Sequence, residues 1–171
     1  MLRVQGFPPV SAPDARILIL GSMPGVASLE AYRYYAHPRN AFWPIMDALL
    51  DADIPDDEHR YQRRLAKLID ARIALWDVMY RCTRPGSLDS AIDAASIEVN
   101  DFVGFFAAHP GIELVACNGA VADQAYRRRV LPLLDTRWAQ CPVVRLPSSS
   151  PAMASLSVQA KCERWSDALG F

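Results

Sequence analysis

The chain has 171 residues, of which 51% are hydrophobic and 22% charged, enough for one domain with a substantial core and too few for two ordinary domains. Eighteen Lys and Arg residues against nineteen Asp and Glu residues leave a net charge of −1, which excludes a whole-molecule field that attracts nucleic acid. Any phosphate-binding surface must therefore be local. We expect a single domain over residues 1–171, with residues 1–12 as its most flexible part.

The N-terminal residues carry none of the signals that send a protein to a membrane or out of the cell. No long apolar run precedes Val10, and Pro8 and Pro9 interrupt the segment. This pattern argues against a signal peptide and a membrane span. We therefore expect an intracellular, cytoplasmic protein with no membrane partner.

The cysteines are dispersed and form no Cys-x-x-Cys pair. They are Cys82, Cys117, Cys141 and Cys162. Such spacing argues against a zinc or iron–sulfur site and against a disulfide framework. We expect no metal and no cofactor.

Apolar runs alternate with amphipathic segments along the chain. The predicted strands are residues 16–20, 73–78, 113–117 and 143–146. The predicted helices are residues 41–50, 58–69, 97–108, 120–130 and 156–169. This alternation predicts an α/β protein with three layers, α/β/α, and a mostly parallel central sheet. Loops that follow parallel strands meet at one edge of the sheet, where open α/β folds bind ligands.

A glycine- and proline-rich turn follows the first predicted strand. Its sequence is Gly21-Ser22-Met23-Pro24-Gly25. Glycine and proline force a tight, exposed turn at the carboxyl end of a buried strand. The turn is therefore a candidate ligand site, and a tight turn without a ligand is the alternative.

The next segment mixes aromatic and polar side chains in an unusual way. Around Pro38 it carries Tyr34, Tyr35, His37, Arg39, Asn40, Phe42 and Trp43. This mixture is too polar for a core and too aromatic for an ordinary solvated loop. It suits a site for a flat ring, although Trp43 can instead enter the core with the helix that follows.

Arginines cluster at three places. Arg81 and Arg84 follow the second predicted strand, and the sequence Pro85-Gly86-Ser87 then closes a loop. In a parallel sheet this loop lies on the same edge as the turn at residues 21–25, so both arginines are candidate phosphate contacts. The groups Arg60, Arg63, Arg64 with Lys67, and Arg127 to Arg129 with Arg137, are read as solvated helix faces. We expect Asp77, at the end of the same strand, to orient a loop.

Three ordered motifs resemble those of the uracil-DNA glycosylase superfamily, and within it the DNA-deoxyinosine (hypoxanthine-DNA) glycosylase branch. They are Gly21 to Gly25, Tyr35-Ala36-His37-Pro38-Arg39-Asn40-Ala41-Phe42-Trp43, and Leu146-Pro147-Ser148-Ser149-Ser150-Pro151. The resemblance covers nearly the whole chain. It implies a glycosylase of base-excision repair that flips a deaminated base out of DNA and hydrolyses its N-glycosidic bond, with hypoxanthine as the leading substrate.

The resemblance assigns catalysis to Asn40, with His37 as its helper. An amide carbonyl can hold a water molecule without adding a charge, whereas the alternative is that Asn40 only caps the helix that follows. Met23 departs from relatives that carry Asp or Asn in the first motif, and a thioether cannot activate water. His37 is a candidate donor to the departing base or to a phosphate, or else an ordinary loop histidine.

The remaining site residues are expected to hold the base or the DNA. The candidate base-binding residues are Gly21, Ser22, Met23, Pro24, Gly25, Tyr35, Phe42 and Asn118. The candidate DNA-binding residues are Arg39, Arg81, Arg84, Ser148, Ser149, Ser150 and Met153. Met153 is the candidate wedge that fills the space left by the flipped base. For Asn118, a simple Asn-Gly turn is the alternative.

Lysine is scarce, which bears on the reaction type. Lys67 and Lys161 are the only lysines, and neither is expected at the ligand-binding edge. Strand cleavage by a glycosylase needs an amine nucleophile, so we expect a monofunctional enzyme. We also expect a monomer. Its partner is DNA containing a deaminated base. The alternatives are a uracil-DNA glycosylase of mismatched or single-stranded DNA, a catalytically inactive damage-binding module, and a generic α/β nucleotide-binding protein.

Overall fold

A parallel four-stranded sheet forms the middle layer of the protein. The computed structural model describes residues 3–171. The sheet has the order β3-β2-β6-β7, and each neighbouring pair is parallel. Its strands are β2 (Ile17–Gly21), β3 (Ile73–Asp77), β6 (Leu114–Asn118) and β7 (Val143–Leu146). All four predicted strands are therefore present, with ends that differ by one residue at most.

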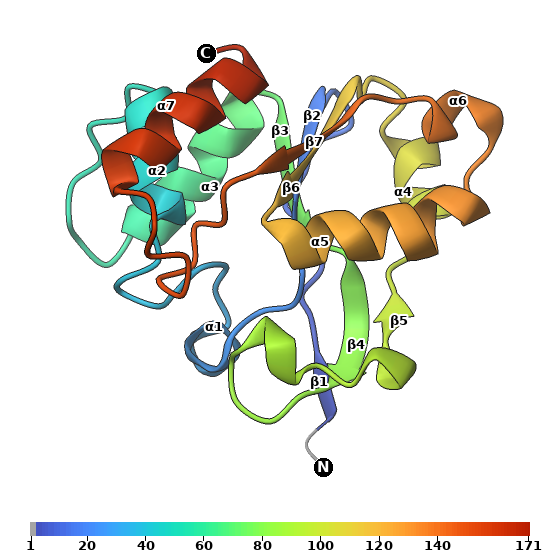
Figure 1. Cartoon of the computed structure of the whole chain (residues 1–171). Helices are drawn as coiled ribbons and strands as arrows, with labels where there is room; N and C mark the ends of the chain where they lie inside the picture. The colour runs from blue at the N-terminus through green and yellow to red at the C-terminus, as the bar shows by residue number, and fades with distance from the viewer. Residues whose placement is uncertain (1–2) are drawn as a thin grey trace.

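Helices cover both faces of this sheet (Figure 1). One face carries α2 (Phe42–Leu49), α3 (Arg60–Asp70) and α7 (Val158–Leu169). The other carries α4 (Phe102–Ala108), α5 (Ala120–Ala125) and α6 (Thr136–Ala139). The predicted three-layer α/β/α fold is confirmed.

The residues of the parallel strands contribute to two separate hydrophobic cores, one on each face of the sheet. Leu18 and Leu20 pack in the cluster that contains Phe102 of α4, whereas Ile19 packs in the cluster that contains Trp165 of α7. Alternate residues of a strand point to opposite faces, so a strand covered on both faces must be apolar throughout. This explains why the predicted strands are continuous apolar runs.

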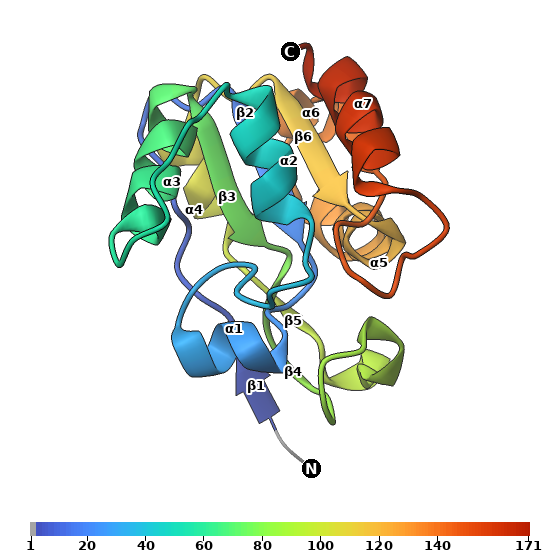
Figure 2. The same ribbon diagram turned by 90° about the vertical axis from the view of Figure 1, so that its left-hand side faces the viewer.

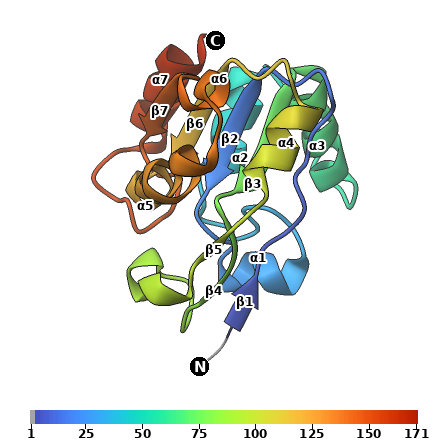
Figure 3. The ribbon, with the colours of Figure 1, turned by 90° about the vertical axis from the view of Figure 1, so that its right-hand side faces the viewer.

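A small antiparallel sheet lies beyond the carboxyl ends of the parallel strands (Figures 2 and 3). Its order is β1-β4-β5. The strands are β1 (Arg3–Gln5), β4 (Met79–Thr83) and β5 (Glu98–Val99), and α1 (Val26–Ala31) lies beside them. This sheet was not predicted, because its strands are short and mix polar with apolar residues.

The small sheet changes two further expectations. Residues 3–5 pair with β4, and Val10 bridges Leu75, so the described part of the segment expected to be flexible is tied to both sheets. Residues 1–2 lie outside the described part. The helix predicted from residue 97 begins at Phe102, where the Asp101 carboxylate accepts a hydrogen bond from the Gly104 N–H. The helix predicted over residues 120–130 is α5 followed by a π-helical turn at Tyr126–Val130.

Candidate active site

A cavity of about 730 Å³ opens at the carboxyl ends of β2, β3 and β6. Its walls come from segments far apart in the sequence. They are residues 21–25, 34–40, 87–90, 118–121 and 148–153, together with Asp77. The volume lies in the range of small-molecule and cofactor sites. The three motifs singled out in the sequence therefore meet at one edge of the sheet, as the parallel topology requires.

The turn after β2 approaches its neighbours too closely for a side chain at its first position. A Cβ atom on Gly21 would lie 2.3 Å from Oδ1 of Asp77 and 2.8 Å from the hydroxyl oxygen of Tyr35. Further along, the backbone N–H groups of Met23 and Gly25 donate to no acceptor among the hydrogen bonds of residues 3–171. Both residues line the cavity. Their N–H groups are thus available to a ligand.

Arg84 holds this turn from behind. Its guanidinium is fully buried and donates to the backbone oxygens of Pro24, Gly86 (2.9 Å) and Met23 (3.4 Å). The expected contact between Arg84 and a DNA phosphate is wrong for this reason. Arg81 differs again, because it lies within β4, pairs with Glu98 at 2.7 Å and does not line the cavity. Arg81 lies away from the cavity because the chain enters a second sheet directly after β3, and its expected phosphate contact stays a prediction.

Tyr35 presents an aromatic ring to the cavity, and Phe42 supports it from behind. The two rings stack with centroids 4.1 Å apart at 18°. Phe42 is fully buried and does not line the cavity, so its expected contact with a base is wrong. Tyr35 is half-buried, and its positive φ of 53° turns the chain at this point. Tyr34 and Trp43 are buried, the latter in the core beside α3.

Asn40 lines the cavity and also binds the start of α2. It lies one residue before the N-cap position, Ala41, and its Oδ1 accepts the N–H of Phe42, the first residue of the helix, at 2.9 Å. An amide oxygen has two lone pairs, so one remains for a second donor such as water. The capping and catalytic interpretations of Asn40 are therefore compatible.

His37 and Arg39 form the outer part of the same wall. Nδ1 of His37 accepts the backbone N–H of Arg39 at 3.1 Å. A neutral imidazole that accepts through Nδ1 carries its proton on Nε2, which makes Nε2 a donor. The Arg39 side chain is exposed and takes part in none of the ion pairs of residues 3–171. Both residues line the cavity.

Asn118 ties two walls of the cavity together. Its Nδ2 donates to Oγ of Ser149 (2.9 Å) and to the hydroxyl of Tyr35 (3.1 Å), while its Oδ1 accepts the N–H of Ser149 (2.9 Å). Both amide hydrogens are thus occupied within the protein, whereas Oδ1 keeps a second lone pair, so the expected contact of Asn118 with a base stays a prediction. Ser149 is buried and its carbonyl accepts the N–H of Ala41 at 2.9 Å, so Ser149 does not present a phosphate contact either.

The neighbouring residues of that loop keep their hydroxyls at the cavity. Oγ of Ser148 accepts the N–H of Ser150 (3.2 Å), and Oγ of Ser150 accepts the N–H of Ala152 (3.2 Å), so each hydroxyl hydrogen is left to donate. Met153 is half-buried and also lines the cavity. Behind the loop, the buried Nζ of Lys161 donates to the carbonyl of Ser150 at 3.3 Å and does not line the cavity.

Two carboxyl groups of the cavity had been given no ligand-binding role from the sequence. Asp77 is 3% exposed, and its Oδ2 has no hydrogen-bond partner. Burial, together with the nearby Asp89 carboxylate, raises the pKa of Asp77 to about 7, although Arg84 acts in the opposite direction. Oδ2 of Asp89 accepts from Oγ of Ser22 at 2.8 Å, and burial raises the pKa of Asp89 as well. The available signal was an acidic residue directly after the buried run at residues 73–76.

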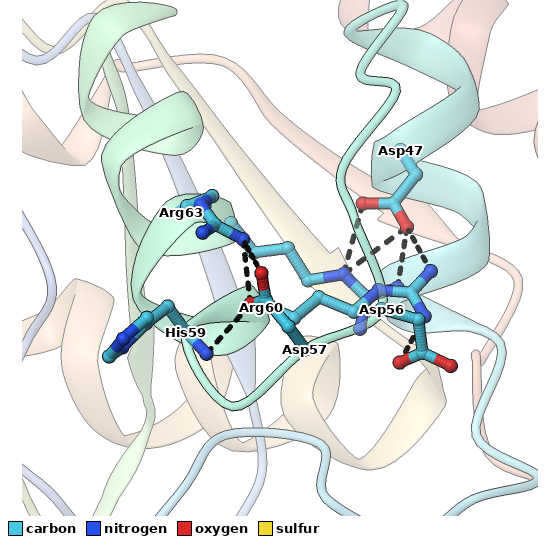
Figure 4. Close-up of polar contacts among 7 residues, drawn as sticks. Asp47, Asp56, Asp57, His59, Arg60 and Arg63 are labelled. Carbon is cyan, nitrogen blue, oxygen red and sulfur yellow. Dashed lines mark hydrogen bonds and ion pairs between the residues drawn. The ribbon is translucent and has the colours of Figure 1, made fainter.

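The arginines of α3 form ion pairs away from the cavity (Figure 4). Arg60 pairs with Asp56 at 2.9 Å, and Arg63 pairs with Asp57 at 2.7 Å. Arg64 pairs with Asp47 of α2. These pairs neutralise the cluster locally, in keeping with its interpretation as a charged helix face.

Metal-binding and membrane-spanning features were also sought over residues 3–171. Within that range no group of three or more His, Cys, Asp or Glu side chains is arranged to hold a metal ion. Nor does any helix there have the length and apolar character needed to cross a bilayer.

Comparisons with known proteins agree on one family. The model of the uracil DNA glycosylase superfamily matches residues 8–169. The hypoxanthine DNA glycosylase of Methanosarcina barkeri (strain Fusaro / DSM 804) is 38% identical over 118 residues, 69% of this chain and 72% of the relative. That of Methanosarcina acetivorans is 36% identical over 159 residues, 93% of this chain and 94% of the relative. The solution NMR structure of a candidate uracil DNA glycosylase from Methanosarcina acetivorans superposes with a TM-score of 0.76 at 34% identity, covering 95% of this chain and 94% of that one.

Proposed function

The chain belongs to the uracil DNA glycosylase superfamily, and we propose that it is a monofunctional DNA glycosylase that releases hypoxanthine from DNA. The observation that carries this proposal is the cavity at the carboxyl ends of the strands, which joins an aromatic ring, an amide oxygen and unpaired backbone N–H groups. Two relatives named hypoxanthine DNA glycosylase, at 38% and 36% identity, support the choice of base. The protein acts as a monomer inside the cell and needs no metal or cofactor.

The flipped base lies against the exposed face of the Tyr35 ring. Glycosylases read an extruded base by stacking it on aromatic side chains and by hydrogen bonds to its edge. Phe42 stacks behind Tyr35, and Asn118 donates to the Tyr35 hydroxyl, so the ring is fixed before the base arrives. Such preorganisation lowers the cost of ordering the site on binding.

Hydrolysis then exchanges the base for water at C1′ of the deoxyribose. The water oxygen bonds to C1′ as the bond to N9 breaks, and the electron pair of that bond leaves with the base. The proton that the water loses ends on the departing base, so the products are free hypoxanthine and an abasic deoxyribose. Oδ1 of Asn40 holds the water through its second lone pair. The N–H groups of Met23 and Gly25 stabilise the negative charge that develops on the base, and Nε2 of His37 donates to it.

The duplex is held at the rim of the cavity. Arg39 and the hydroxyls of Ser148 and Ser150 contact phosphates, which position the DNA without reading its sequence. Met153 enters the space that the flipped base leaves. Neither lysine supplies an amine to the cavity, since Lys67 lies in α3 and Lys161 is bound to the back of the serine loop. The reaction therefore stops at an abasic site.

Base release from defined duplexes tests this proposal. Duplexes that carry one hypoxanthine, uracil, xanthine or adenine are incubated with the protein in EDTA and then treated with alkali, which cleaves abasic sites. We expect cleavage at hypoxanthine and none at adenine, and only after alkali. Faster cleavage at uracil would favour a uracil-DNA glycosylase, whereas binding without release would favour an inactive damage-binding module.

A further inference from the structure

Leu88 is a large apolar side chain that is exposed and yet lines the cavity. It is 60% exposed and belongs to neither hydrophobic core. Among the exposed large apolar side chains of residues 3–171, Leu88 alone lines the cavity. A single exposed leucine is ordinary on a protein surface, and Leu133, 63% exposed and away from the cavity, is such a case. The position of Leu88 at the mouth of a ligand cavity is what requires an explanation.

The residues on both sides of Leu88 are fixed to the segment that follows β2. Oγ of Ser87 accepts the N–H of Val26 at 2.8 Å. Oδ2 of Asp89 accepts a hydrogen bond from Oγ of Ser22, also at 2.8 Å. These bonds hold the backbone at Leu88, so its side chain is presented at the rim of the cavity before a ligand arrives.

Two loops form the mouth of the cavity. The chain after β4 supplies residues 87–90, and the chain after β7 supplies residues 148–153. Figures 2 and 3 show both segments on the same side of the molecule. Exposed residues of each line the cavity, namely Leu88 in the first loop and Pro151 and Ala152 in the second. A group that lies at the mouth therefore meets Leu88 from one loop and the serine loop, residues 148–153, from the other.

The proposed reaction determines which part of the DNA lies at the mouth. The base occupies the cavity, and the bond that is hydrolysed joins the base to C1′, so the deoxyribose comes next. A deoxyribose ring has a face of C–H groups that carries no charge. Burial of such a surface against a leucine is favourable, whereas a phosphate would lose hydration there without gaining a hydrogen bond.

We propose that Leu88 packs on the C–H face of the extruded deoxyribose and holds the flipped nucleotide at the mouth of the cavity. This inference rests on the proposed function, because that function places the sugar there. The contact forms only after flipping, and it depends neither on the identity of the base nor on the complementary strand. It therefore differs from the role proposed for Met153, which fills the space left inside the duplex.

Two measurements on Leu88→Ala test the contact. In single-turnover release of hypoxanthine, the maximal rate divided by the half-saturating protein concentration should fall about 10-fold, both on a duplex and on the same strand alone. Binding to a duplex with a tetrahydrofuran abasic-site analogue, which keeps the sugar ring and lacks the base, should weaken by a similar factor. Binding to the undamaged duplex should not change, because no sugar is extruded from it.

Matched substitutions separate the apolar contact from general effects of a surface change. Leu88→Met keeps an apolar side chain of similar volume and should stay within about twofold of wild type. Leu88→Asn has a polar side chain of similar shape and should lose as much as Leu88→Ala. Leu133→Ala removes an equally exposed leucine away from the cavity and should have no effect on release or binding. All four variants should unfold at the wild-type temperature, because substitutions of exposed residues seldom change stability.

Several results would overturn the proposal. A loss confined to the duplex would make Leu88 a second wedge, and a loss of release without a loss of tetrahydrofuran binding would make it a contact to the base. An equal loss on the undamaged duplex would make it a general DNA contact. Unchanged values in Leu88→Ala would remove the contact and leave the glycosylase function intact. A wild-type protein that releases no base would overturn the proposed function, and the tetrahydrofuran binding of Leu88→Ala would then decide the contact by itself.

Discussion

Polar groups are paired at the corner between α2 and α3, whereas several polar groups at the wall of the cavity have no partner. At the corner, Arg60 and Arg63 each have a carboxylate partner (Figure 4). Arg64 pairs with Asp47. At the cavity, Oδ2 of Asp77 has no partner, and neither do the N–H groups of Met23 and Gly25 within residues 3–171. Paired groups stabilise the fold, whereas a buried group without a partner costs free energy. Unpaired N–H groups at the wall of a cavity are therefore better candidates for ligand contacts than the paired groups of the corner.

The same distinction divides the site residues themselves. Asn118, at the end of β6, and Ser149, in the third motif, use their polar groups on each other. Asn40 uses one lone pair and keeps another. Occupancy of hydrogen-bonding groups, rather than membership of a motif, therefore decides which residues are tested as catalytic.

The largest effect is expected at Asn40. Asn40→Ala should lower the single-turnover rate of hypoxanthine release about 100-fold or more, because the water loses its acceptor. It should also cost about 1 kcal/mol of stability, because α2 loses its cap. Asn40→Ser is the matched control, since a serine oxygen restores the cap without the reach of an amide. A rate near that of wild type in either variant would remove Asn40 from the mechanism.

Arg84 should matter chiefly for stability. Arg84→Met leaves the carbonyls of Pro24 and Gly86 without their buried donor, so the free energy of unfolding should fall by about 3 kcal/mol in urea titrations. Arg81→Met, which breaks a partly exposed pair with Glu98, should cost about 1 kcal/mol or less. If Arg84→Met kept full stability and instead weakened DNA binding in a salt-dependent manner, the phosphate contact first expected for Arg84 would be restored.

Met153 should affect paired DNA more than unpaired DNA. Flipping a base out of a duplex costs a few kcal/mol, and a wedge offsets part of that cost. Met153→Ala should slow release from a duplex about 10-fold and release from the same lesion in a single strand by much less. The double variant Ser148→Ala, Ser150→Ala should instead weaken both substrates together. Equal losses of Met153→Ala on both substrates would show that Met153 is only a packing residue.

The smallest effect on activity is expected at the ion-paired corner. Arg64→Ala should lower the free energy of unfolding by about 1 kcal/mol, because its pair with Asp47 is partly buried and lies against Trp43. Base release should be unchanged. A cycle with Asp47→Ala and the double variant isolates the pair. A marked loss of activity in Arg64→Ala would show that the corner contributes to DNA binding after all.

Much of the fold could be predicted from the sequence because the parallel strands are buried on both faces. The apolar runs at residues 17–20 and 73–76 identify these segments as strands even when the neighbouring strands are not known. The small sheet could not be predicted in the same way. Its strand β4 has five residues, of which only Met79 and Cys82 are buried, and the strand β1 with which it pairs lies far away in the chain.

The location of the site could be predicted from the sequence better than the role of each residue in it. Turn composition located the cavity, because glycine and proline mark the ends of strands. Side-chain roles depended on contacts that sequence spacing does not contain. Phe42 and Tyr35 are both aromatic members of one motif, and only the left-handed turn at Tyr35 decides which ring faces the cavity. Likewise, arginine side chains are mostly exposed in proteins, so the sequence around Arg84 gave no reason to expect that this side chain is fully buried.

The amide of Asn118 has a consequence for motion. It binds Ser149 by two hydrogen bonds and the Tyr35 hydroxyl by a third, so it joins the loop proposed to contact DNA to the ring proposed to stack on the base. Local opening of the serine loop must break the two bonds to Ser149, and it frees the amide that also orients the Tyr35 hydroxyl. The two walls therefore form one cooperative unit, and protection of the Ser149 amide against hydrogen exchange should report the integrity of the stacking platform.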